Sequence, residues 1–442
     1  MPLGPWRLIA YAAPSLVTSV AALPMALFIP AFYSDDLGVP LAAVGVAIAL
    51  SRLLDVVTDP MIGTFSDRLR LPLGRRKPWM LMGVPLFLLS LWKIFVPGDS
   101  ASAGYLLLWS ALLYLGFTMI DLPHKAWGAE LSTDYDERSR ITSWREAIST
   151  VGQVFLLAVL VWLSGQGIEA ADDQLRWIAQ AVIFLLPLLV AICLFSVEEK
   201  EPEGAHQVGR STWEGLRIVG RNPAFLRMVG AVLFFVSGVA IQGTLHRLVL
   251  ADVMMDEQKF PIMILLENLG TLAAVPVWLA VSVRIGKSRA LLAAALWLAV
   301  WSLPLVFLRE GQTTALIVIV VLRGSSFASI LFLANSMAAD VIDLDTLESG
   351  EQRSGLFFAV WGMVIKLSLA LGVVLGTMLP AAFGYEPAEG LVSRDVQASL
   401  MAVYGGIPAI LMGVGALFLR RFPITRAHHA AVRAELDARA RA

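Results

Sequence analysis

Two aspartates lie close together inside a segment that is otherwise apolar. Asp55 and Asp59 are four residues apart, so in a helix they share one face, and Arg52 lies about one turn before them. Two carboxylates this close repel each other unless a cation lies between them or one of them holds a proton. The pair therefore suits a site that binds and releases Na⁺ or H⁺. The alternative is an internal ion pair between Arg52 and Asp55.

A second polar group lies in the apolar stretch 104–131. Thr118 and Asp121 are three residues apart, Lys125 follows one turn later, and Trp127 lies beyond it. A hydroxyl, a carboxylate, a cation and an aromatic ring together could bind a polyol. The alternative is that Lys125 only neutralises Asp121 near a membrane surface, where Trp127 serves as an anchor.

Lys366 is a single cation within a long apolar segment, and no acidic residue lies within several helical turns of it. Because an ionisable side chain is costly in apolar surroundings, we expect its partner to come from another helix. The candidates are Asp55, Asp59 and Asp121. Such an ion pair would couple the two halves of the chain.

These charges are notable because the chain as a whole is apolar. Of its 442 residues, 57 % are hydrophobic and 16 % are charged, and the mean hydropathy is +0.73, whereas soluble domains carry about 25 % charged residues. A helix needs about 20 apolar residues to cross a bilayer. The composition therefore predicts an all-α polytopic membrane protein with about twelve spans.

The apolar segments fall into two groups of six on either side of one long polar stretch. We predict an N-terminal six-helix bundle over residues 1–197, a cytoplasmic linker over 198–223, a C-terminal bundle over 224–420 and a cytoplasmic tail over 421–442. Lysines and arginines gather in alternate loops, and the positive-inside rule then places both termini in the cytoplasm. The expected location is the inner or plasma membrane.

The inside loops of the two halves resemble each other. The runs 66–68 and 74–77 have a reduced counterpart in 284–287, and Ala129-Glu130 is matched by Ala339-Asp340. These matches indicate two repeats of six spans in the same orientation, facing each other across a central cavity. We expect loop charges to latch the closed state. The residues of this expected cytoplasmic latch are Asp67, Arg68, Arg75, Glu130, Arg138, Asp340 and Arg353.

Several other classes of protein have little support. Cys193 is the single cysteine, so it cannot form an internal disulfide, and 34 basic against 35 acidic residues give no excess for binding nucleic acid. The chain has no phosphate-binding loop, zinc spacing or nucleophile elbow. We expect no enzyme and no cofactor besides the coupling ion. The expected partners of a monomer are a small-molecule substrate and the lipid bilayer.

Two runs identify a family resemblance. DVVTDPMIGTFSDR over 55–68 and GRRKPW over 74–79 closely resemble the glycoside-pentoside-hexuronide:cation symporters of the major facilitator superfamily. The resemblance continues through 118–123, 134–145 and the loop at 339–340, so it covers both halves. It implies a fold of two six-helix bundles and cation-coupled sugar uptake by alternating access.

The resemblance also implies roles for single residues. The residues that match the family's cation site are Asp55, Asp59 and Thr118. The residues that match two of its sugar contacts and its helix-eleven lysine are Asp121, Arg145 and Lys366.

Two departures from the family pattern concern the substrate. Ser19 stands where the best known member has a sugar-binding acid, and Lys125 replaces a sugar-stacking tryptophan, with Trp127 two residues away. Losing an acid and gaining a base shifts the site towards positive charge, so we hypothesise an anionic sugar such as a hexuronide. The alternatives are a lysophospholipid or other amphiphile carried by the same fold, and a membrane sensor that transports nothing.

Overall fold

The computed structural model describes residues 3–29, 32–68, 73–98, 101–166, 171–199, 217, 219–351, 353–383, 393–420 and 422–441. Throughout these ranges the regular structure is helical and includes no strand, in agreement with the predicted all-α class. The side chains of Asp55 and Arg68, and most of the predicted linker, lie outside the described residues.

Six long helices occupy the first half of the chain. They are α1 (Pro5–Leu27), α3 (Leu41–Arg68), α4 (Lys77–Phe95), α5 (Ala103–Glu130), α6 (Tyr135–Gly165) and α7 (Ala171–Ser196), with a short π-helical turn η1 (Phe32–Asp36) after α1.

The second half repeats this pattern with more interrupted helices. Its elements are α9 (Pro223–Leu248), η2 (Val249–Val253), η3 (Glu257–Lys259), α10 (Phe260–Ile285), α11 (Lys287–Ser302), η4 (Leu303–Phe307), α12 (Thr313–Gly324), α13 (Phe327–Ser349), α14 (Ser354–Ala382), α15 (Arg394–Met401), η5 (Ala402–Gly406), α16 (Ile407–Leu419) and α17 (Arg426–Arg441).

Nine helical segments within the described ranges are long and apolar enough to cross a membrane. Prolines begin several of the helices, including α1, α4, α9 and α10, because the first turn has no use for the amide hydrogen that proline lacks. Inside α3, Pro60 leaves the carbonyl of Val56 without its usual helical hydrogen bond, close to Asp59 in the sequence. A loosened backbone therefore adjoins the candidate cation site.

The chain forms two compact units. The first comprises Met1–Ile218, Ile342–Met363 and Val432–Ala442, and the second comprises Val219–Val341 and Val364–Ala431. The end of α13 and the beginning of α14 therefore pack with the first half of the chain. The division into bundles at 1–197 and 224–420 stays a proposal.

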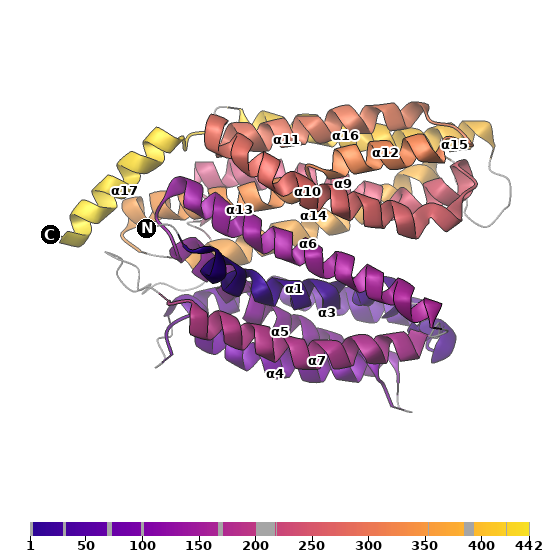
Figure 1. Cartoon of the computed structure of the whole chain (residues 1–442), viewed down its shortest axis with the longest axis horizontal. Helices are drawn as coiled ribbons and strands as arrows, with labels where there is room; N and C mark the ends of the chain where they lie inside the picture. Colours follow the sequence, from indigo (N-terminus) through magenta and orange to yellow (C-terminus); the bar gives the residue numbers. More distant parts are fainter. Residues whose placement is uncertain are drawn as a thin grey trace. The chain divides into compact units, whose positions relative to one another are not determined.

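In the first unit α5 lies beside both α3 and α4, and α1 packs on α6 and α7 (Figure 1). In the second unit α16 packs between α9 and α11, and α10 packs on α12. One crossing in the first unit is especially close. A Cβ atom at Gly63 of α3 would lie only 2.6 Å from the carbonyl oxygen of Gly355 in α14. Glycines at this crossing let the two backbones approach each other.

Candidate functional site

Asp59 and Thr118 meet in the first unit, where α3 packs on α5. Thr118 Oγ1 donates a hydrogen bond to Asp59 Oδ1 over 2.8 Å, and the two residues are only 4 % and 2 % exposed. A buried carboxylate in a membrane helix is costly unless its charge is compensated. Carboxylate and hydroxyl oxygens are ligands for hard cations, and a carboxylate also accepts a proton. The pair can therefore hold either coupling ion.

Arg52 lies exposed on α3 and is directed towards α5. Its guanidinium carbon is 3.9 Å from the centre of the Tyr114 ring, which is a cation–π contact. The side chain of Asp55 lies outside the described residues, so its place in the cation site and its expected contact with Arg52 stay predictions.

Asp121 joins a row of alternating charges on α5 and α6. Its Oδ2 is 2.5 Å from Lys125 Nζ and its Oδ1 is 3.6 Å from Arg145, whose other nitrogen is 2.5 Å from Glu146. About a fifth of each of the Asp121 and Lys125 side chains is exposed, whereas Arg145 is buried. The row includes Glu146, which the sequence interpretation missed although it adjoins Arg145. Oxygens and nitrogens of this kind can hydrogen-bond a sugar's hydroxyls or carboxylate.

Trp127 and Ser19 are both buried in the first unit. Trp127 is fully buried, its ring meets Tyr11 edge-on at 6.2 Å between centres, and Lys77 Nζ lies 5.3 Å from the ring centre. Ser19 is buried between α1 and α6, and its hydroxyl lies 2.8 Å from the carbonyl oxygen of Ser149. Both side chains thus take part in helix packing, and their roles as substrate contacts stay predictions.

Lys366 is half-buried on α14 and belongs to the second unit. The aspartates expected to pair with it belong to the first unit. The ion pair between the halves therefore stays a prediction.

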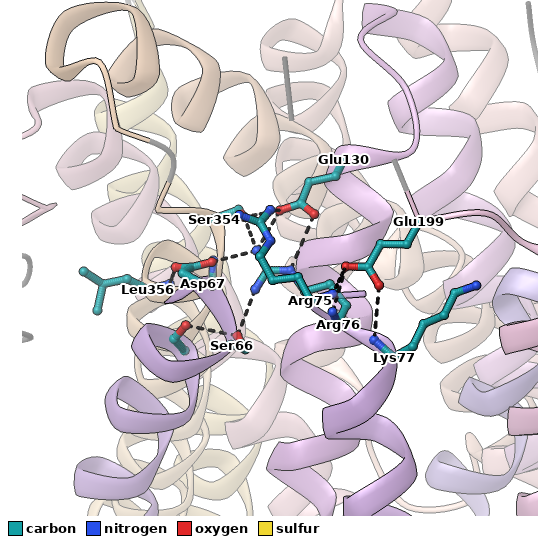
Figure 2. Close-up of polar contacts among 11 residues, drawn as sticks. Ser66, Asp67, Arg75, Arg76, Lys77, Glu130, Glu199, Ser354 and Leu356 are labelled. Carbon is teal, nitrogen blue, oxygen red and sulfur yellow. Dashed lines mark hydrogen bonds and ion pairs between the residues drawn. The ribbon is translucent and has the colours of Figure 1, made fainter. Parts of the chain in front are cut away.

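Arg76 lies at the centre of a polar cluster in the first unit (Figure 2). Its guanidinium is 2.6 Å from Asp67 and 2.7 Å from Glu130, and it also donates to the hydroxyls of Ser66 and Ser354. Arg76 is fully buried. Burial by itself would lower the pKa of Arg76, but the two carboxylates outweigh it and hold that pKa above its ordinary value.

Asp67 also holds the first turn of α14. Its Oδ1 accepts a hydrogen bond from the amide of Gly355 over 2.9 Å, and its Oδ2 accepts one from Leu356 over 3.1 Å. The first amides of a helix have no partner within the helix, and a carboxylate there also interacts favourably with the helix dipole. One residue of α3 thereby fixes the beginning of a helix almost 300 residues later in the chain.

The beginning of α4 and the end of α7 cap each other beside this cluster. Glu199 accepts hydrogen bonds from the amides of Arg75 and Arg76 at 2.7 Å each (Figure 2). Lys77 Nζ donates to the carbonyl oxygen of Leu194 over 2.7 Å. Gly74 allows this arrangement because its φ is +109° and a Cβ there would collide with the Glu199 carboxylate. The GRRK run is therefore a structural unit as well as a charged loop.

Of the predicted latch, Asp67, Arg75 and Glu130 come together, with Arg75 2.8 Å from Glu130. Arg138 instead binds Asp343, with its two terminal nitrogens 2.6 and 3.1 Å from the two carboxylate oxygens. Arg353 pairs locally with Glu351.

Asp340 belongs to the second unit, where it binds Lys287 at 2.6 Å and lies 3.6 Å from His429. Its place in the predicted latch stays a prediction. The cluster around Arg76 and the Arg138 pair also contain Arg76, Ser354 and Asp343, which the sequence analysis did not assign to the latch. Arg76 could have been found from the GRRK run, whereas Ser354 carries no charge to signal its role.

Residues 10–426 match the family model described as MFS/sugar transport protein. The chain belongs to this family. The finding confirms the resemblance to the glycoside-pentoside-hexuronide:cation symporters, because symporters are also among the similar proteins. The family is one of transporters.

Three relatives illustrate the range of this similarity. The inner membrane symporter YicJ of Escherichia coli is 25 % identical, over 91 % of this chain and 88 % of its own. The glucuronide carrier protein homolog of Escherichia coli is 23 % identical over 98 % and 96 %. The sodium-dependent lysophosphatidylcholine symporter 1 of Xenopus tropicalis is 24 % identical over 93 % and 85 %.

The fold is also that of solved transporters. The proton:xylose symporter XylE, bound to 6-bromo-6-deoxy-D-glucose, matches with a TM-score of 0.67 and 11 % identity, over 96 % of this chain and 98 % of its own. This likeness confirms the predicted major facilitator fold.

Proposed function

We propose that this protein is a symporter that couples uptake of a sugar or glycoside to the flow of Na⁺ or H⁺ by alternating access. The observation that carries the proposal is the buried pair of Asp59 and Thr118, one helical turn from Asp121 on α5. The family to which the chain belongs, and its similarity to symporters along nearly the whole chain, support this function.

The proposed cation site consists of Asp59, Thr118 and Asp55. Cation binding would neutralise the carboxylates on α3 and release Thr118 from its hydrogen bond to Asp59. Because Thr118 and Asp121 lie one turn apart on the same helix, this change would reach the substrate site directly. Reciprocal coupling follows, since a cation that raises substrate affinity must itself bind more tightly when substrate is present.

The proposed substrate site is built on Asp121, Lys125 and Arg145. Lys125 and Arg145 flank Asp121, and Arg145 also pairs with Glu146, so a substrate carboxylate would find Lys125 as its charge partner once Asp121 turns to the sugar hydroxyls. We therefore favour an anionic sugar such as a hexuronide. The glucuronide carrier protein homolog among the relatives supports this substrate class.

Proteoliposome uptake tests the coupling. Labelled glycosides, glucuronides and lysophosphatidylcholine are offered with an imposed Na⁺ gradient, an imposed H⁺ gradient or neither. We expect one gradient to drive accumulation of a sugar, Asp59→Asn to abolish accumulation while keeping exchange, and Asp172→Asn, an exposed aspartate of the same half, to behave as wild type. Thr118→Ser should keep more coupling than Thr118→Ala if the hydroxyl is a ligand.

The same assay separates the substrate classes. If lysophosphatidylcholine accumulates and no sugar does, the proposed substrate becomes an amphiphile and the proposed cation coupling is kept, in line with the Xenopus relative. Binding without flux under every gradient would favour a sensor. Lys125→Met should weaken glucuronide uptake more than uptake of a neutral glucoside; equal losses would reject the charge-based substrate assignment.

We further propose both termini on the cytoplasmic side of the cell membrane. A cytoplasmic latch would then comprise Arg76 with Asp67 and Glu130, and Arg138 with Asp343. Reversing the last pair tests it. Arg138→Asp alone should impair transport, and Arg138→Asp with Asp343→Arg should restore part of it, because the bidentate contact is then rebuilt in reverse.

A further inference from the structure

A second buried polar cluster lies in the second unit and shares no residue with the sites described above. It joins side chains from α9, α10, α12 and η5. Its members are Gln242, His246, Glu267, Arg323 and Tyr404. Ionisable groups inside membrane helices are expensive, so a cluster of them calls for a function.

Arg323 connects the cluster. Its Nη2 lies 2.7 Å from Glu267 Oε1 and 3.0 Å from His246 Nε2, and its Nη1 donates to Gln242 Oε1. Arginine only donates hydrogen bonds, so His246 Nε2 must accept, and a neutral His246 then carries its proton on Nδ1. That proton is donated to Tyr404 Oη, 2.7 Å away.

This arrangement leaves two acceptors facing each other. His246 Nε2 and Glu267 Oε2 are 3.5 Å apart, and when His246 is neutral and Glu267 is ionised neither atom has a hydrogen to offer the other. One added proton would join them, either as a carboxylic O–H donating to nitrogen or as an imidazolium N–H donating to oxygen. Because Nε2 has a single lone pair, Arg323 gives up its hydrogen bond to His246 in both cases, while it keeps its contact with Glu267 Oε1.

Two further observations favour an exchange of protons here. Glu267 has 18 % of its side chain exposed, whereas His246 has 5 % and Arg323 has 2 %, so the carboxylate is the part of the cluster that can be reached. Arg323 Nε is buried and makes no hydrogen bond with the residues that the structure describes. A buried donor without a partner is rare and calls for an explanation, which a change of hydrogen bonds within the cluster would supply.

We propose that Glu267 and His246 together form a proton-binding site in the second unit, separate from the cation site at Asp59. The proton comes from water and is shared between Glu267 Oε2 and His246 Nε2, and the net charge of the cluster rises by one. The other groups that face it are Arg323 from α12, Gln242 from α9 and Tyr404 from η5, with Arg323 the only one of these that is charged. The site does not depend on which substrate is carried.

Infrared difference spectroscopy of the full-length protein in lipid nanodiscs tests the proposal, because protonated carboxyl groups absorb apart from carboxylates. We titrate between about pH 5 and pH 9 without substrate, a range that spans the histidine transition. We expect a carboxylic band that fades as pH rises. This band should be missing in Glu267→Gln and retained in Glu257→Gln, whose carboxylate forms an exposed ion pair with Arg247.

Two more variants make the result decisive. Asp59→Asn should keep the band, which separates this site from the proposed cation site and from any failure of transport. His246→Gln should keep the band but move its midpoint by about one pH unit or more, because the shared partner is lost. A band that persists in Glu267→Gln overturns the proposal. If that variant does not fold, an unchanged midpoint in His246→Gln overturns it instead.

Discussion

The two halves of the chain use one pair of corresponding lysine and acidic residues in different ways. Lys287 lies 210 residues after Lys77, and Asp340 lies 210 residues after Glu130. In the second unit Lys287 binds Asp340 directly at 2.6 Å, and both side chains are buried. In the first unit Lys77 instead caps α7, and Glu130 binds Arg75 and Arg76.

The arginines that precede α4 explain this difference. Residues 73–76 before α4 include a glycine and two arginines, whereas α10 and α11 are joined through Gly286 alone. With two arginines available, the first unit can hold Glu130, Asp67 and the beginning of α14 together. At the corresponding place in the second unit Lys287 binds Asp340, with His429 of α17 near by. We therefore expect that removing the central cation of the cluster around Arg76 lowers the unfolding free energy more than removing the cation of the Lys287–Asp340 pair.

The largest expected effect is that of Arg76→Ala. The substitution leaves Asp67 and Glu130 buried with a weaker cation partner, and breaking such a group costs about 3–5 kcal/mol of unfolding free energy. Unfolding by SDS in mixed micelles measures it, and Arg247→Ala, which breaks an exposed pair, is the control with an expected loss of about 0.5 kcal/mol. Equal losses in the two variants would remove the special role of Arg76. Arg76→Lys should recover only part of the lost unfolding free energy, because lysine lacks the planar guanidinium that binds two acceptors at once.

Lys287→Met should cost less, about 3 kcal/mol, because His429 remains beside Asp340. The same unfolding assay measures it. The double variant Lys287→Met with Asp340→Leu should recover most of the loss, since a buried pair replaced by apolar side chains of similar size is often tolerated. If Lys287→Met proves more damaging than Arg76→Ala, the comparison of the two halves is reversed.

Gly74→Ala sharpens the comparison at the level of the loop. Its φ of +109° and its close approach to Glu199 both disfavour a side chain, and we expect a loss of about 2 kcal/mol. Gly311→Ala provides the control, because Gly311 has a φ of +77° with no atom near its added Cβ. The loss of unfolding free energy at Gly74 beyond that at Gly311 measures the close contact with Glu199. Equal losses would mean that the cap formed by Glu199 adds nothing to stability.

The smallest expected effect is that of His429→Gln, about 1 kcal/mol, because its 3.6 Å contact with Asp340 only supplements Lys287. In the Lys287→Met background the same change should cost more, since His429 is then the nearest partner of Asp340. A double-mutant cycle measures this coupling. Strict additivity would show that His429 takes no part in the pair.

Much of the fold could be predicted from the chain alone. The apolar segments correctly indicated an all-α membrane protein, and the family resemblance of the runs at 55–68 and 74–79 correctly indicated the major facilitator fold. Bilayer thickness sets the length of a spanning helix, and backbone hydrogen bonds must close within it, so hydropathy alone identifies such helices. The site is less predictable. The sequence selected Asp59 and Thr118, which do meet, but it also selected Trp127, which is buried against Tyr11.

The sequence by itself determined which residues carry a cost in the membrane. A carboxylate, an arginine or a lysine in an apolar segment must find compensation, and that necessity singles out Asp59, Asp121 and Lys366 by their positions in the chain alone. Only the tertiary structure decided the partners of such groups, because these lie tens to hundreds of residues away. Asp67 reaching the amides of Gly355 and Leu356 is one example. Helix crossings set such distances to within an ångström, and hydrogen bonds depend on distances at that scale.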